Sequence, residues 1–208
     1  RFTRRYRAKA QEIIYRGGRA EAVAISGNER IPCDAVVLAS AGGALPLISG
    51  TGFRAPLTSL TGFTLTLELS DSEALPALTV ASPEKGFILS RLDRRLRATG
   101  RFFLGSPAEK EKKAECNRLY DAVMGSFENL RSNTVASQFW SGEFLASPDR
   151  FPLAGPVPGA DNVILNIAHG PFGLAGAGES AEIAAASALG EDPGEFAAFC
   201  SPGRFAEK

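Results

Sequence analysis

The sequence predicts an α+β fold, with antiparallel strands in the middle of the chain between two outer pieces that together form a small α/β unit. Apolar and polar residues alternate in three middle segments, as is typical of half-exposed antiparallel strands. These segments are 62–69, 86–89 and 95–99. The short, unbroken apolar run at 35–39 predicts a strand covered on both faces. The outer pieces, 12–43 and 160–190, have the order strand, small-residue loop and helix.

Local signals place the other elements. Further strands are expected at 12–16, 22–25, 134–144 and 162–168. A helix is expected over 107–128, because Ser106 can cap it and Pro107 suits its first turn. The Ala-rich segment 174–189 predicts a closely packed, largely buried helix.

Composition argues against several classes of function. Lys+Arg and Asp+Glu balance at 23 each, so no global field would attract nucleic acid or an acidic membrane. No apolar run approaches the ~20 residues that a transmembrane helix needs. Three widely spaced cysteines and a single His predict no metal site, and the cysteines are expected to be reduced thiols.

The first residues are basic and contain no acid. Five of the residues 1–9 are Arg or Lys. A cut chain is one interpretation. A mitochondrial targeting remnant is the other, because such segments are rich in Arg and poor in acids. We therefore expect a mitochondrial location, with the cytoplasm as the alternative.

A glycine-bearing loop precedes the Ala-rich helix. The residues His169-Gly170-Pro171-Phe172-Gly173 lie between an expected strand and 174–189. A helix that starts after such a loop presents free N–H groups, which attract anionic groups. A reduced flavin carries negative charge that such a helix start would stabilise. A purely structural turn is the alternative interpretation.

Three motifs near the end of the chain follow one another in a fixed order. They are FWSG at 139–142, SPDRFPLAGP at 147–156 and NVILNIAHG at 162–170. With the Ala-rich helix that follows, they resemble the C-terminal signature of the D-amino-acid oxidase/dehydrogenase (DAO) family, FAD-dependent enzymes that include glycine and sarcosine oxidases. Shorter stretches resemble other parts of that family at 34–39, 60–66, 97–101 and 199–205.

The resemblance implies a set of site residues. The cofactor-binding residues it implies are Ala39, Gly42, His169, Gly170, Phe172 and Gly173. Phe144 and Trp140 fall at substrate positions, although Trp140 also suits a core role and His169 a turn role. No residue is assigned as catalytic, because in this chemistry the C–N bond is oxidised as a hydride passes from the substrate carbon to FAD, and the protein orients the two.

The family pattern is broken at the substrate anchor. Phe144 stands where the family has an Arg that holds the substrate carboxylate through two hydrogen bonds, and Leu145 where it has Pro. Phe cannot donate a hydrogen bond, so the usual anchor is absent. We therefore expect no turnover of ordinary amino acids, and we expect Phe144 to pack against apolar neighbours.

The loops next to the expected flavin site also differ. Ala168 replaces the first Gly of the family's Gly-His-Gly. After the 35–39 strand, Ala41 stands at a family Gly and Gly42 follows one residue late. Pro171 removes one N–H from the turn. These departures indicate a different substrate or relaxed selection on flavin chemistry.

The resemblance implies a partial FAD-binding-like unit at 1–56, an antiparallel substrate-type domain at 57–150 and a return to the first unit at 151–208. We expect the family's dinucleotide-binding loop to lie outside this sequence. The chain would then be the C-terminal half of an FAD-dependent amine or amino-acid oxidoreductase. A separate protein chain or a removed segment would complete it, and we expect a bound partner chain near 35–39. By itself, this chain should bind FAD weakly or not at all. A non-catalytic structural subunit of a larger, mitochondrial complex is the alternative, and an independent α+β binding domain is a third interpretation.

Overall fold

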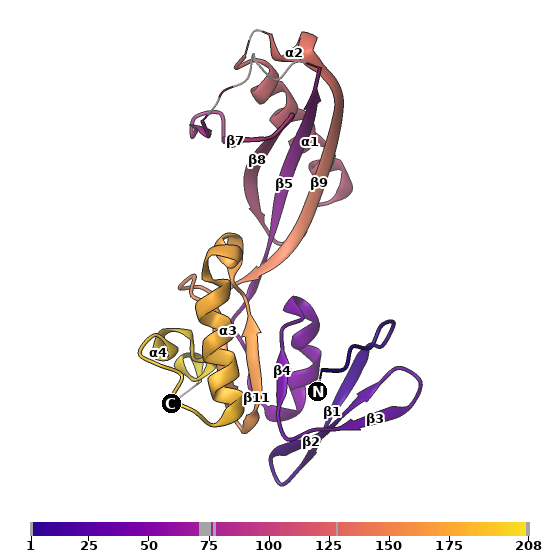
Figure 1. Ribbon diagram of the computed structural model, residues 1–208, viewed down its shortest axis with the longest axis vertical. Coiled ribbons are helices and arrows are strands. Elements are labelled where there is room, and N and C mark those ends of the chain that lie inside the picture. The colour runs from indigo at the N-terminus through magenta and orange to yellow at the C-terminus, as the bar shows by residue number, and fades with distance from the viewer. Residues whose placement is uncertain (1, 71–75, 77, 128, 207–208) are drawn as a thin grey trace. The chain divides into compact units, whose positions relative to one another are not determined.

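The computed structural model describes residues 2–70, 76, 78–127 and 129–206 (Figure 1). Contacts divide the chain into two compact units, one formed by 1–58 with 144–208 and the other by 59–143. Helices and largely antiparallel sheets are mixed, which confirms the predicted α+β class. The assignment of cofactor and substrate roles to separate domains stays a prediction.

The first unit contains two three-stranded sheets. One is antiparallel, in the order β1 (Ala10–Arg16), β2 (Arg19–Ile25), β3 (Glu29–Pro32). The other has the order β10 (Leu153–Val157), β11 (Ala160–Ile167), β4 (Val36–Leu38). In the second sheet, β11 is antiparallel to β10 and parallel to β4. Segments far apart in the sequence are thus neighbours in this sheet.

One buried side chain joins the two sheets. Asn162, 7% exposed, accepts a hydrogen bond from Ala20 N at 2.9 Å and donates to Ala20 O at 2.8 Å. It also donates to Asp34 O, just before β4, at 2.8 Å. Because all three bonds go to backbone groups, Asn162 holds β2 and the start of β4 against β11.

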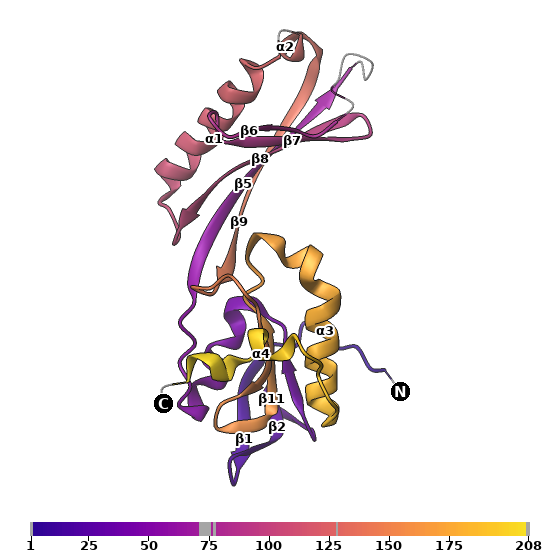
Figure 2. The ribbon, with the colours of Figure 1, turned by 90° about the vertical axis from the view of Figure 1, so that its left-hand side faces the viewer.

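The helix α3 (Gly173–Leu189) packs against β10 and β11 (Figure 2). Its buried residues are Ser180, Ile183 and Ala184. The small residues before Ser180 are exposed, and Leu174 is 95% exposed. The prediction of a largely buried helix was therefore wrong for α3 as a whole, because small residues allow close packing but do not show that a neighbour is present.

Short helices complete the first unit. Two 3-10 helices, Ala41–Ala44 and Pro46–Thr51, follow β4. After α3 come α4 (Ala197–Cys200) and a 3-10 helix at Pro202–Phe205. The largest apolar cluster of this unit includes Leu47, Ile48, Leu153, Val163 and Leu165.

The second unit is a five-stranded sheet with a helix packed against it. The order of its strands is β6 (Val80–Ser82), β7 (Phe87–Leu92), β8 (Arg95–Leu104), β5 (Thr58–Leu69), β9 (Thr134–Ala146). The helix α1 (Glu109–Met124) covers one face, and a short helix, α2 (Leu130–Asn133), precedes β9. Alternate residues of β5 meet Leu119 and Val123 of α1 in a buried cluster.

The start of α1 differs from its predicted start. Ala108, rather than Ser106, is the residue before the first turn. The Glu111 carboxylate accepts a hydrogen bond from Ala108 N at 2.8 Å. A residue inside the helix therefore satisfies the backbone at its entrance, where we expected a cap from outside.

Candidate functional site

Two parallel strands end side by side in the first unit. Residues 163–165 of β11 pair in parallel with 36–38 of β4. Parallel strands carry their carboxyl ends at the same edge of a sheet, where open α/β folds bind ligands. A pocket of about 320 Å³ lies there. Its walls come from the segments after β4 and β11, the end of β9 and the start of α3.

The pocket walls combine apolar groups with a few polar ones. They comprise Ala39, Ala41, Phe144, Leu145, Asn166, Ile167, Ala168, His169, Gly170, Gly173, Ala177 and Ser180. Lys, Arg, Asp and Glu are absent from these lining residues. A ligand held here would be recognised by hydrogen bonds and apolar contacts.

His169 is fixed from two sides. Its backbone forms an isolated antiparallel bridge with Ala146, at the end of β9. Its ring Nε2 lies 2.9 Å from Ser180 Oγ, and Ser180 Oγ donates to Ala177 O at 3.2 Å. Whichever of the two donates, Ser180 Oγ ties the His169 ring to the first half of α3. Burial lowers the pKa of His169, because it disfavours the charged form of the ring.

The backbone of this turn needs small residues. Gly170 has a φ of 59°, in the left-handed region. A Cβ added to Gly173 would lie 3.0 Å from the Cβ of His169, so Gly173 lets α3 start directly against that residue. Ala168 and Ala41 also have positive φ, 62° and 49°. Both stand at family Gly positions, so the left-handed backbone is present although the glycines are not.

Asn166 carries the one buried side-chain oxygen or nitrogen without a hydrogen-bond partner in the described part of the chain. This atom is Oδ1, and the residue lines the pocket. An unsatisfied buried acceptor costs about 1–3 kcal/mol, so native proteins rarely leave one unpaired without a reason. A ligand with an N–H or O–H group would satisfy it.

Five of the residues expected at the site are brought together by the structure. They are Ala39, His169, Gly170, Gly173 and Phe144. Gly42 lies in the 3-10 helix after β4 and Phe172 is 73% exposed, and neither is among the lining residues. Trp140 lines a different hollow, in the second unit. We expected Phe144 to be sealed among apolar neighbours, but this half-buried residue lines the pocket.

The sequence prediction missed Asn166, Ala177 and Ser180. Asn166 lies within the motif at 162–170, and its polar side chain in an apolar strand was the signal available. Ser180 lies 11 residues after His169, and only the path of α3 brings the two side chains together.

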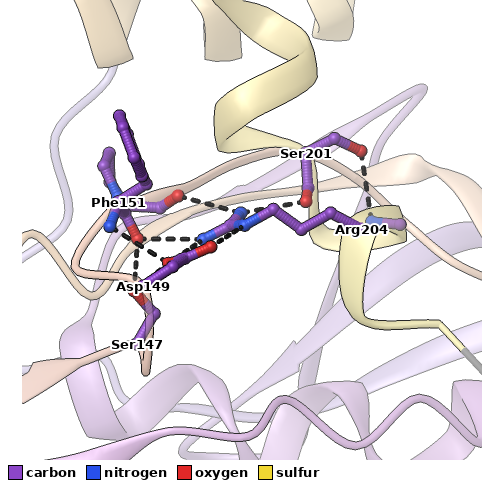
Figure 3. Close-up of polar contacts among 7 residues, drawn as sticks. Ser147, Asp149, Phe151, Ser201 and Arg204 are labelled. Atoms are coloured by element: carbon purple, nitrogen blue, oxygen red, sulfur yellow. Dashed lines mark hydrogen bonds and ion pairs between the residues drawn. The ribbon is translucent and has the colours of Figure 1, made fainter.

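The motif that begins at Ser147 contributes to a hydrogen-bond network rather than to the pocket. Asp149 binds Arg204 through both carboxylate oxygens, at 2.8 Å to Nε and 3.1 Å to Nη2 (Figure 3). Arg204 also donates to three backbone oxygens, those of Pro152, Phe151 and Ser201. All five guanidinium N–H groups are therefore used.

Hydrogen bonding also shifts the titration of Asp149. The bond from Arg204, with those from Ser147 and Phe151 N, lowers the pKa of Asp149 to about 2. The side chain of Arg204 is only 15% exposed. This network fastens the C-terminal segment to the turn before β10, and it leaves no donor of Arg204 for a ligand.

The arrangement of the first unit is that of a flavin-dependent oxidoreductase fold. The chain matches the family description "FAD dependent oxidoreductase" over residues 3–187. It therefore belongs to the DAO family of FAD-dependent oxidoreductases. Across the described residues, no helix is long and apolar enough to cross a membrane.

Two curated proteins of similar sequence are D-amino acid dehydrogenases. The chain is 28% identical over 205 residues to a D-amino acid dehydrogenase of Xanthobacter autotrophicus, and the match covers 99% of this chain and 48% of that protein. A D-amino acid dehydrogenase of Sinorhizobium medicae is also 28% identical, over 86% of this chain and 42% of its own length. The chain thus spans about half the length of the curated relatives it matches.

Solved structures show the same fold. Glycine oxidase from Geobacillus kaustophilus superimposes with a TM-score of 0.78 at 17% identity, over 96% of this chain and 53% of that one. An L-amino acid deaminase from Proteus vulgaris has a TM-score of 0.75 at 20% identity, over 95% of this chain and 49% of that one. These two similarities concern the fold alone.

Proposed function

We propose that this chain forms the C-terminal half of an FAD-dependent oxidoreductase that acts on a C–N bond, and that its pocket holds the flavin ring. The observation that carries the proposal is the unsatisfied Oδ1 of Asn166 in a pocket at the carboxyl ends of β4 and β11. A flavin ring has an N–H donor and flat apolar faces, which fit this acceptor and the apolar walls. When bound, FAD would supply the acceptor for a hydride from the substrate carbon that bears the nitrogen, as the C–N bond is oxidised to an imine.

The chain's own residues would bind the flavin ring and orient it. The first turn of α3 has no acidic residue and no side-chain cap, so its N–H groups would favour the negative charge of a reduced flavin. His169 is held by Ser180, and burial disfavours its charged form, so the ring would contact the flavin through its polar edge. Gly42 and Phe172 stay proposed cofactor neighbours, on the family motif alone.

The rest of the cofactor needs other residues. We propose that the ADP half of FAD is held by the part of the family fold that this sequence does not contain, in a separate chain or a removed segment. β4 lies at an edge of its sheet, and among the residues that the structure describes only β11 pairs with it. Val37 of β4 is 47% exposed. A strand of the completing chain would pair there, as expected near 35–39. A mitochondrial location stays a prediction.

The proposed substrate is an amine without the usual carboxylate anchor. Phe144 lines the pocket, and Lys and Arg are absent from the lining residues, so no guanidinium or ammonium group there would pair with a carboxylate. Trp140 stays a proposed substrate neighbour on the motif alone. Phe144 also favours the second candidate, a non-catalytic structural subunit in which this side chain occupies the old site.

Flavin absorbance tests the proposal. The native assembly that contains this chain should carry flavin after purification. His169→Ala should lower the bound flavin, whereas Leu189→Ala, which changes an exposed side chain at the far end of α3, should leave it unchanged. The chain by itself should bind added FAD weakly or not at all in calorimetry. A native assembly without flavin would instead support the structural subunit.

A further inference from the structure

His169 and Ser180 meet at the start of α3. The ring Nε2 of His169 lies 2.9 Å from Ser180 Oγ, and Ser180 is only 2% exposed. The two residues are 11 positions apart, and both line the pocket at the carboxyl ends of β4 and β11. Both belong to the first unit, so this contact is complete within the chain and needs no further segment.

The hydroxyl of Ser180 has two neighbours and one proton. Besides His169 Nε2, Ala177 O lies within hydrogen-bond distance of Oγ, at 3.2 Å. If Nε2 carries a proton, it donates to Oγ while the hydroxyl donates to Ala177 O, and both contacts are hydrogen bonds. If Nε2 carries none, the one hydroxyl proton must choose between two acceptors. Because buried polar groups are rarely left unpaired, the arrangement with the proton on Nε2 is favoured.

The other ring nitrogen of His169 is not engaged. Within the part of the chain that the structure describes, Nδ1 has no hydrogen-bond partner, and it is not among the buried unpaired atoms. A ligand can therefore reach it. In a neutral ring with its proton on Nε2, Nδ1 carries a lone pair and accepts a hydrogen bond.

We propose that Ser180 is a positioning residue, which keeps the proton of the neutral His169 ring on Nε2 and thereby presents Nδ1 to the pocket as a hydrogen-bond acceptor. Together with Asn166 Oδ1, Nδ1 selects ligands that carry N–H or O–H groups, because a carboxylate would meet lone pairs at both atoms. The choice of a flavin ring as this ligand rests on the proposed function, whereas the action of Ser180 on His169 does not.

Nuclear magnetic resonance can observe this ring alone, because His169 is the only histidine of the sequence. The chain is prepared with isotope-labelled histidine and shown to be folded by circular dichroism. It is held at about pH 8, above the ordinary pKa of 6.5, where the ring is neutral because burial lowers its pKa further. The ring proton should lie on Nε2 and exchange slowly with water, and Nδ1 should resonate as a nitrogen without a proton.

Ser187 provides the matched control for Ser180. It lies in the same helix, and its hydroxyl also donates to a backbone oxygen, that of Ile183 at 2.7 Å. Ser180→Ala should speed the exchange of the Nε2 proton at least about fivefold, which corresponds to about 1 kcal/mol, because the acceptor is lost. Ser187→Ala should leave this rate unchanged. Ser180→Thr keeps a hydroxyl and should restore slow exchange.

The role of Nδ1 is tested by the flavin content of the native assembly. An Asn side chain can place its amide oxygen near the position of Nδ1, whereas a Gln side chain reaches the position of Nε2. His169→Asn should therefore keep more bound flavin than His169→Gln. Ser180→Ala should also lower the bound flavin, but by less than His169→Ala, since the ring is retained. Ser187→Ala should leave the flavin content unchanged.

Three results would overturn the proposal. The first is a ring proton on Nδ1 in the unsubstituted chain, a measurement that needs no variant to fold. The second is an equal exchange rate in the Ser180→Ala and Ser187→Ala variants. The third is more bound flavin in His169→Gln than in His169→Asn. A native assembly without flavin would contradict the proposed function instead, and the exchange measurements would still decide the role of Ser180.

Discussion

The first unit holds two polar sites that differ in one respect. In the Asp149–Arg204 network, every guanidinium donor has a partner within the chain. In the pocket, Asn166 Oδ1 has no partner among the residues that the structure describes. Both sites lie in motifs that resemble the same family. We call the network the closed site, because its donors are all paired, and the pocket the open site, because a buried acceptor in it is not. A fully satisfied network stabilises the fold, whereas an open buried acceptor is where a ligand is expected.

The largest expected effect is at the closed site. Arg204→Ala should lower the free energy of unfolding by about 2–4 kcal/mol, because it removes five donors and leaves Asp149 without its cation. Urea unfolding measures this change. The matched control is Arg150→Ala, an exposed Arg in the neighbouring turn, which should cost less than about 0.5 kcal/mol. Equal effects of the two substitutions would show that the network does not hold the C-terminal segment.

The next effect concerns the open site, whose lining residues include no cationic side chain to hold a carboxylate. In the completed protein with FAD, ordinary D- or L-amino acids should give no measurable flavin reduction. Phe144→Arg should strengthen amino-acid binding at least about tenfold, which corresponds to about 1.4 kcal/mol. Phe144→Leu is the apolar control and should change nothing. Robust amino-acid-dependent reduction with Phe144 in place would contradict this interpretation of the pocket.

A smaller effect is expected in the backbone of the pocket turn. Ala168→Gly should raise the free energy of unfolding by about 1 kcal/mol, because a Cβ at a φ of 62° is strained. Ala175→Gly, in the exposed first half of α3, should lower it by about as much, since Gly weakens a helix. Thermal unfolding distinguishes the signs. Destabilisation by both substitutions would mean that the turn is not strained.

The smallest effect is the pH dependence of the closed site. The pKa of Asp149 falls from its ordinary 3.8 to about 2 on folding. The stabilisation from its charged form is thus present above pH 3.8 and lost as the pH falls toward 2. Asp149 is partly exposed, so solvent screens the gain. Asp149→Asn should flatten this part of a plot of stability against pH, and an unchanged slope would contradict the assignment.

Local patterns predicted much of the second unit. Period-two alternation found β5, β7 and β8, because one face of each is buried under α1. The strand β10 was missed, since Gly155 and Pro156 indicate a turn. This strand lies at the edge of its sheet, where Pro is tolerated.

Tertiary features of the first unit could not be predicted from local patterns. Asp149 and Arg204 are 55 residues apart, so no local pattern pairs them. The motif placed His169 and Phe144 at one pocket, but it did not show that Asn166 Oδ1 would be left without a partner. Whether this oxygen has a partner depends on the tertiary surroundings of the side chain, which a local sequence pattern does not reveal.

The contrast between the two sites is tested most directly by the flavin content of two variants in the purified native assembly. Asn166→Leu should keep the fold and lose flavin, because it removes an acceptor that only a ligand would use. Asp149→Asn should weaken the fold and keep the flavin content per folded molecule. Full flavin in Asn166→Leu, or flavin lost only from Asp149→Asn, would contradict the assignment of the open pocket to the flavin.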